Sequence, residues 1–389
     1  MSLKNLVVYL LILCWNLTPS NAQVAEKIYG KNKVLKPNSY YLYQLELWKI
    51  ETEKNPTNPD AWYNFYRASR NAYIKGEEDN SQHSKGINRF ERLQLIVNKM
   101  EVYVPDSYEY HYVKWLNSNN NPSQFNHLER AFQLMPNNPE PILSLIIYYE
   151  INGNLKKRNE FIEKYNTTGD YSPGLLNYAY NVLIGLDNNA LILTEGDKDT
   201  EAILLAQRKA IRNDVQLINL NLLLIKSYRN RIFNELGIDS LNYDPLLNEQ
   251  TFQHFQQTII EHLVSNKNNR PVYTSLTVSN EYTNSIKNNY LIGLARKYSL
   301  QPINEIEILK ENIEHKMLLD YLIEYFPTDI SIGNVQSING NYLIPFAQLF
   351  NYYKLQGNNN QAEFYKSTAY KIAVLADIKN QFDILFTTH

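Results

Sequence analysis

The chain has 389 residues, with 38 Lys and Arg against 40 Asp and Glu, a formal charge of −2 and a single cysteine. This near-balance excludes a partner that is held by a large excess of positive charge, such as nucleic acid or an anionic membrane surface. Apolar residues make up 44% of the sequence, so the chain can bury a substantial core, its length allows two or three structural units, and global disorder is excluded.

The first 22 residues have the three parts of a secretory signal peptide. Lys4 supplies the positive start, residues 6–17 form a short apolar run, and Ser20-Asn21-Ala22 is a small-x-small cleavage site. We expect cleavage after Ala22 and export, most simply to a periplasm; an uncleaved N-terminal anchor is the alternative. Cys14 lies in the removed segment, so the mature chain can form no disulfide. No later stretch is long and apolar enough to cross a bilayer.

Three prolines, Pro105, Pro139 and Pro173, lie 34 residues apart, and each opens a segment with apolar residues at helical spacing. An earlier copy begins at Pro59. A period of 34 resembles that of the tetratricopeptide repeat, a pair of helices that buries its apolar face only by stacking on neighbouring pairs. We therefore expect tetratricopeptide-like hairpins over residues 23–180, the alternative being an irregular helical bundle whose prolines are spaced by chance.

The aromatic residues of these repeats have two possible roles. Most are expected to fill the core at the repeat's own aromatic positions, and some to line a concave groove that takes a protein partner. The candidate groove residues are Tyr108, Tyr112, Trp115 and Tyr149.

The pattern changes after residue 178, where short apolar runs bounded by turn residues replace the long helical segments. A strand, a helix and a second strand within about thirty residues predict a parallel pair. We expect a small α/β unit over residues 181–300 with three parallel strands, and any ligand should lie beyond the carboxyl ends of these strands. The expected elements are strands over 190–194, 215–220 and 272–276 and helices over 200–211 and 251–263.

The loop after the first expected strand holds the candidate ligand residues Glu195, Asp197, Asp199 and Thr200. Asp197 and Asp199 match an Asp-x-Asp pattern, in which two carboxylates share a divalent cation and a nucleotide sugar. Lys198 weakens this interpretation, because its ammonium would compete for the same carboxylates. The alternative is structural: Asp199 or Thr200 caps the following helix, whose dipole favours the neighbouring acids. No other catalytic or metal-binding signature occurs, so we expect no catalytic residue, no metal and no cofactor.

Three blocks of this region resemble one known family. The runs 189–200 and 212–222 and the block Arg270-Pro271-Val272-Tyr273 are similar to the soluble exported part of the protein O-mannosyltransferase-like membrane family of Bacteroidota. The resemblance covers roughly residues 170–300. Lys198 departs from the family motif, which has Asn at this place. The membrane-spanning half that would carry sugar transfer has no counterpart in this sequence, so the resemblance implies no enzymatic activity here.

A further helical, tetratricopeptide-like region is expected over residues 301–389. Phe346 and Phe350 precede a turn at Gly357, and Ala362 and Ala369 take the small-residue positions where paired helices touch. The expected fold is therefore mainly α, with helical hairpins on both sides of the α/β unit.

These features favour an exported, non-enzymatic scaffold or accessory subunit of a cell-envelope complex. We expect a protein partner in the envelope, peripheral association with an outer-membrane complex at most, and no nucleic acid. The alternative function is a non-catalytic module that binds a glycan or sugar-lipid for an envelope glycosylation system.

Overall fold

The structure is a computed structural model that describes residues 24–72, 89–241, 249–266, 270–284, 286–324 and 326–387. The expected signal peptide and its cleavage site lie outside the described residues. Within the described ranges, no helix combines the length and the apolar character needed to cross a bilayer. The chain forms two compact units, one of residues up to 29 with residues 36–119, and one of residues 30–35 with residues 120–389.

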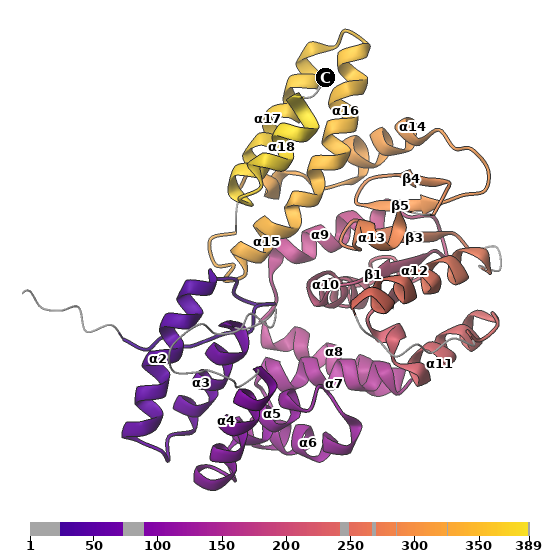
Figure 1. Cartoon of the computed structure of the whole chain (residues 1–389). Coiled ribbons are helices and arrows are strands. Elements are labelled where there is room, and N and C mark those ends of the chain that lie inside the picture. The colour runs from indigo at the N-terminus through magenta and orange to yellow at the C-terminus, as the bar shows by residue number, and fades with distance from the viewer. Residues whose placement is uncertain are drawn as a thin grey trace, which may run out of the picture. The chain divides into compact units, whose positions relative to one another are not determined.

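The smaller unit is built from paired helices (Figure 1). Helices α2 and α3 pack against each other around Tyr41, Leu45, Ala68 and Ala72. Ser107 caps α5, the last helix of this unit: its hydroxyl accepts a hydrogen bond from the backbone N–H of Tyr110 at 3.1 Å. The helices described in this unit are α2 (Asn38–Lys54), α3 (Pro59–Ala72), α4 (Arg89–Tyr103) and α5 (Tyr108–Asn117).

The larger unit opens with helices, two of which begin at the prolines that set the 34-residue spacing. Proline suits the first helical position, where its missing N–H needs no intrahelical partner. Helices α7 and α8 share a core that contains Ile142, Ile146, Ile162 and Tyr165. The elements are η1 (Pro122–Gln124), α6 (Phe125–Leu134), α7 (Pro139–Ile151), α8 (Leu155–Thr168) and α9 (Pro173–Ile184).

A mixed sheet of five strands follows, in the order β2-β1-β3-β5-β4. The central strand β1 pairs in parallel with β2 and with β3, whereas β5 pairs antiparallel with β3 and with β4. The three expected strands are present and pair in parallel, but the expectation that the sheet consists of these three alone is wrong. Two short strands with polar residues extend the sheet through a hairpin at one edge. The strands are β1 (Leu191–Thr194), β2 (Gln216–Asn219), β3 (Val272–Ser275), β4 (Asn289–Leu291) and β5 (Ala295–Tyr298).

Helices cover both faces of the sheet. Ile192 and Tyr273 face a core that includes α9 and α10 (Asp197–Arg208). Leu191, Leu193 and Val272 face a second core, with α11 (Lys226–Leu236) and α12 (Glu249–Ser265) (Figure 1). Because both faces are buried, β1 is a continuous apolar run rather than an alternating one.

The C-terminal helices extend the core that covers the first face of the sheet. Phe346, Tyr365, Ala369 and Phe382 belong to the same cluster of buried residues as α9 and α10. The described part of the chain is thus mainly α-helical, as predicted, with one small sheet. The remaining elements are η2 (Leu222–Leu224), α13 (Asn280–Thr283), α14 (Glu305–Lys310), the π-helical turn η3 (Glu311–Lys316), η4 (Asp320–Leu322), α15 (Ile332–Asn339), η5 (Gly340–Tyr342), α16 (Leu343–Leu355), α17 (Asn359–Leu375) and α18 (Lys379–Thr387).

Residues 30–35 are a short N-terminal segment that belongs to the larger unit. The buried amide of Asn334 donates hydrogen bonds to the carbonyl oxygens of Lys31, at 3.1 Å, and Asn32, at 2.8 Å. Lys33 forms an ion pair with Asp170. Segments that are 303 residues apart in the sequence therefore complete one unit.

Candidate functional site

The predicted ligand loop lies at the carboxyl ends of β1 and β3. Helix α10 begins at Asp197, earlier than expected, and its N-cap residue is Gly196, which makes no side-chain cap. The expectation that Asp199 or Thr200 caps this helix is therefore wrong. Asp197 and Asp199 lie instead in its first turn, where the helix dipole favours negative charge.

Glu195 connects the loop after β1 to the segment after β3. Its Oε2 accepts a hydrogen bond from the backbone N–H of Ser279 at 2.8 Å, and its Oε1 accepts one from the hydroxyl of Tyr282 at 3.4 Å. Burial and the neighbouring Glu195 carboxylate raise the pKa of Tyr282 to about 12. The Glu195 carboxylate is thus engaged with its own chain.

Asp199 is 1% exposed. One carboxylate oxygen accepts a hydrogen bond from the Thr277 hydroxyl, and the other accepts one from the backbone N–H of Thr200 at 2.9 Å. The Thr277 hydroxyl also lies 2.9 Å from the Ser275 hydroxyl. Burial raises the pKa of Asp199 to about 6, although these hydrogen bonds act in the opposite direction.

Thr200 is also engaged inside the fold. Its hydroxyl donates to the carbonyl of Gly196 at 2.6 Å and accepts from the side-chain amide of Asn219 at 2.9 Å. It also lies 2.8 Å from the hydroxyl of Thr194. These contacts join the ends of β1 and β2 to the start of α10.

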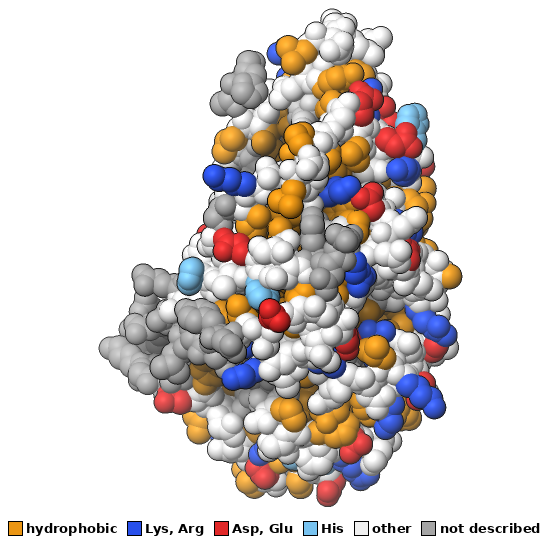
Figure 2. Space-filling view, turned by 90° about the vertical axis from the view of Figure 1, so that its right-hand side faces the viewer, with side chains coloured by type: hydrophobic (Ala, Val, Ile, Leu, Met, Phe, Trp, Pro, Cys, Tyr) orange, Lys and Arg blue, Asp and Glu red, His pale blue; other side chains and the backbone are white. Residues whose placement is uncertain are grey.

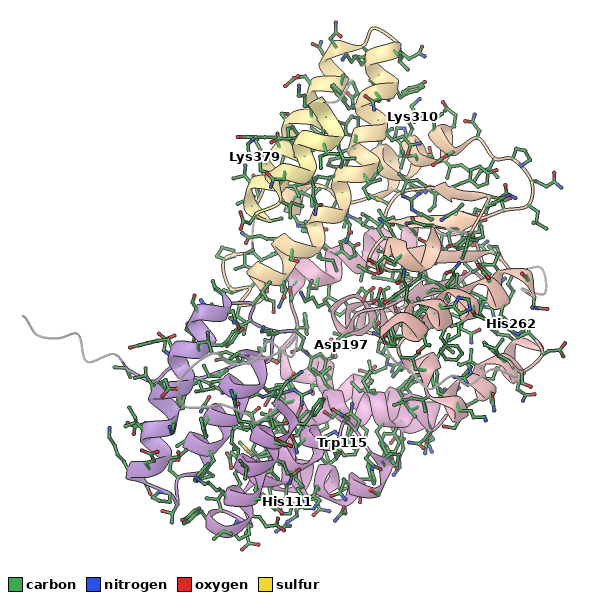
Figure 3. All side chains as sticks on the ribbon, in the orientation of Figure 1. His111, Trp115, Asp197, His262, Lys310 and Lys379 are labelled. Carbon is green, nitrogen blue, oxygen red and sulfur yellow. The ribbon has the colours of Figure 1, made fainter. Side chains whose placement is uncertain are left out.

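Of the four predicted ligand residues, Asp197 has the exposed side chain, and it begins α10 (Figure 3). The side chains of Glu195, Asp199 and Thr200 form hydrogen bonds within the protein that hold the loops in place. These bonds favour a structural role for the three residues over ligand binding. Across the ranges that the structure describes, no three His, Cys, Asp or Glu residues gather in a way that could hold a metal ion.

The four predicted groove residues do not lie in one unit. Tyr108, Tyr112 and Trp115 belong to α5 in the smaller unit and are 7%, 4% and 1% exposed. Figure 3 labels Trp115 on this helix. Tyr149 belongs to α7 in the larger unit, is 8% exposed, and stacks on Phe161 with ring centroids 5.6 Å apart. This burial favours core filling over a groove lining.

The larger unit contains a polar cavity that no sequence pattern indicated. The cavity has a volume of about 480 Å³ and lies among α8, α10, α11 and the beginning of β2. Four arginines from separate parts of the chain line it, namely Arg158, Arg208, Arg231 and Arg270. The arginines follow no motif, because each comes from a different element. Among them, Arg270 alone lies in one of the three blocks that resemble the exported membrane family.

Several large apolar side chains remain exposed on the C-terminal helices. On α17, Phe364, Tyr370 and Val374 are 45%, 45% and 52% exposed, and on α18 Ile384 is 65% exposed. On the face shown in Figure 2, hydrophobic side chains alternate with charged side chains of both signs.

No protein-family model and no curated protein matches this sequence.

Proposed function

We propose that this chain is a non-enzymatic binding protein, a tetratricopeptide-like scaffold for a protein partner in the cell envelope. The observation that carries this proposal is that two helical hairpins of the chain are built in the same way. The hairpin α7–α8, before the sheet, and the hairpin α16–α17, after it, share the same kind of turn and a stacked pair of rings at the same sequence spacing.

The turns of the two hairpins match residue by residue. Each contains a glycine in the left-handed region, Gly153 with φ 71° and Gly357 with φ 72°. The asparagine after each glycine, Asn154 or Asn358, caps the second helix by accepting a hydrogen bond from the backbone N–H three residues later, at 3.1 and 3.2 Å. Such agreement supports two copies of one helical unit.

The contacts inside the hairpins match as well. Tyr149 stacks on Phe161 with ring centroids 5.6 Å apart, and Tyr353 stacks on Tyr365 at 6.0 Å. In both hairpins a tyrosine of the first helix meets a ring 12 residues further along the chain. Helical repeats of this kind commonly act by presenting surfaces to other proteins.

The exposed apolar side chains of α17 give this scaffold a candidate contact surface. Phe364, Tyr370 and Val374 would lose unfavourable contact with water on binding. We place the protein in the periplasm because residues 1–22 have the pattern of a signal peptide. The partner would be an envelope protein, including one of an outer-membrane complex. Glycan binding at the loop from Glu195 to Thr200 is the weaker proposal, because three of its four candidate side chains are engaged internally.

Affinity purification of the tagged full chain from its native envelope, after mild cross-linking, tests this function. The wild type should recover a reproducible protein partner, and the double variant Phe364→Glu/Val374→Glu should lose it. A control with the same added charge, Asn360→Glu/Asn380→Glu, changes exposed polar positions and should retain the partner. Circular dichroism checks that all variants are folded. Equal recovery by all three proteins, or no reproducible partner, would refute the proposal.

A further inference from the structure

The cavity in the larger unit is lined by four arginines and three carboxylates. Glu150 binds two of the arginines: its Oε2 accepts a hydrogen bond from Arg158 at 2.5 Å, and its Oε1 accepts one from Arg231 at 3.3 Å. Arg231 also donates to Glu235 at 2.6 Å. These two carboxylates therefore balance the charges of Arg158 and Arg231.

The remaining charges can be assigned in the same way. Arg208 pairs with Glu163, which lies outside the cavity lining. Asp214, the third lining carboxylate, pairs with Arg212, which also lies outside the lining, at 2.9 Å. After these pairs are counted, the positive charge of Arg270 remains.

Arg270 is held by neutral acceptors. Its Nε donates to the carbonyl of Asn189 at 2.9 Å, its Nη1 to the side-chain oxygen of Gln216 at 2.6 Å, and its Nη2 to the carbonyl of Ala190 at 3.4 Å. Among the residues that the structure describes, no carboxylate forms an ion pair with it. Burial lowers the pKa of its guanidinium, with no nearby carboxylate acting to raise it. A partly desolvated cation without a counter-ion is unfavourable, and an anion in the cavity would relieve this cost.

We propose that the cavity binds a small organic anion whose carboxylate or phosphate group pairs with Arg270. Guanidinium groups bind both kinds of anionic oxygen with directed hydrogen bonds. The volume of about 480 Å³ suits a small molecule. Aliphatic side chains among the lining residues, including those of Leu155, Leu204, Leu217 and Ile232, would contact its carbon skeleton. This site is independent of the protein-binding surface proposed for α17.

Titration calorimetry and thermal unfolding of the full chain test the site, with inorganic phosphate and succinate as separate probes. Sodium chloride at matched ionic strength controls for general screening. The wild type should bind at least one of the two probes saturably, with one site per chain, and should unfold at a higher temperature with that probe than with chloride. The probe that saturates identifies the anionic group.

The decisive variant is Gln216→Glu. It places a carboxylate next to the Arg270 guanidinium with almost no change in shape, so the protein supplies its own counter-ion. The expected result is binding weakened about tenfold or more, together with an unchanged or higher unfolding temperature in the absence of a probe. Arg270→Gln should also abolish binding. Arg130→Gln, an exposed arginine on α6, makes the same charge change as Arg270→Gln away from the cavity and should bind like the wild type.

Three results would overturn the proposal. They are wild-type protein that binds neither probe, stabilisation by chloride equal to that by both probes, and Gln216→Glu protein that binds the probe as tightly as the wild type. Glutamate has the size and shape of glutamine and keeps the oxygen that accepts the hydrogen bond from Arg270. Gln216→Glu therefore tests the proposal even if Arg270→Gln fails to fold.

Discussion

Asp199, in the loop that was predicted to bind a ligand, makes the stability of the fold depend on pH. Its carboxyl group has a pKa of about 6 in the folded protein, against an ordinary value of 3.8, because burial disfavours its charge. The folded state therefore binds this proton more tightly than the unfolded chain does. The resulting stabilisation is fully present below about pH 4 and is lost as the pH rises through about 6.

The variant Asp199→Asn tests this coupling. From pH 4 to 7 the free energy of unfolding of the wild type should fall, with roughly 3 kcal/mol of the change due to Asp199. The variant should lack that part of the fall, because an amide keeps the acceptor for Thr200 and carries no charge. Urea unfolding at a series of pH values measures the difference. Asp106→Asn removes an exposed carboxylate in the smaller unit and should keep the wild-type slope. An identical slope for Asp199→Asn would contradict the argument.

At the scale of the element, the hairpin turns depend on glycine for different reasons. Gly357 has φ 72°, and an added Cβ would meet nothing within 4 Å, so the conformation alone requires glycine. Gly153 has φ 71°, and an added Cβ would also lie 2.8 Å from Cδ of Arg231. A larger residue in place of Gly153 would therefore meet both an unfavourable backbone conformation and a close contact with Arg231.

Alanine at these two turns should therefore destabilise the protein unequally. Gly357→Ala is expected to cost about 1 kcal/mol of unfolding free energy, the strain of a left-handed non-glycine residue. Gly153→Ala should cost more, because the Arg231 side chain must move. Gly357→Asn should be the mildest change, since asparagine tolerates this conformation. Chemical denaturation of the three variants gives the order, and equal losses for the two alanine variants would contradict the steric part.

Element positions could be predicted where one local rule decides them. Helices α3, α7 and α9 begin at Pro59, Pro139 and Pro173, and β1 follows from its apolar run. Strands β4 and β5 were missed because Asn289–Leu291 and Ala295–Tyr298 are short and rich in polar residues.

The candidate sites were harder to predict than the elements. The hydrogen bond between Asp199 and Thr277 joins residues 78 positions apart, and no local pattern predicts it. The cavity arginines likewise meet only in the folded chain.

At the scale of the whole molecule, the 34-residue spacing does not mark the compact units. The boundary between them falls at Asn119 and Asn120, inside the segment that begins at Pro105. Both asparagines have positive φ, 54° and 60°. Helices begin at two of the spaced prolines, Pro139 and Pro173, whereas α5 begins at Tyr108, three residues after Pro105. The units are set by which cores the helices join. The short segment 30–35 crosses this division and belongs with residues far later in the chain.

Asn334→Ala tests how much the larger unit depends on that segment. The asparagine side chain is 0% exposed, and its loss leaves the carbonyls of Lys31 and Asn32 without these donors. The full chain should lose about 1–3 kcal/mol of unfolding free energy. Hydrogen exchange of residues 30–35 should also become faster. Asn360→Ala, at an exposed position, serves as the control, and unchanged exchange in Asn334→Ala would show that other contacts hold the segment.

The contact of residues 30–35 with Asn334 also determines when, during synthesis of the chain, the larger unit can finish folding. At about 5–20 residues per second, a ribosome takes roughly 15 to 60 s to add the 303 residues between Lys31 and Asn334. Until then the early segment has no carboxyl-terminal partner, and the larger unit cannot close. Its last step of assembly must therefore follow the synthesis of most of the polypeptide.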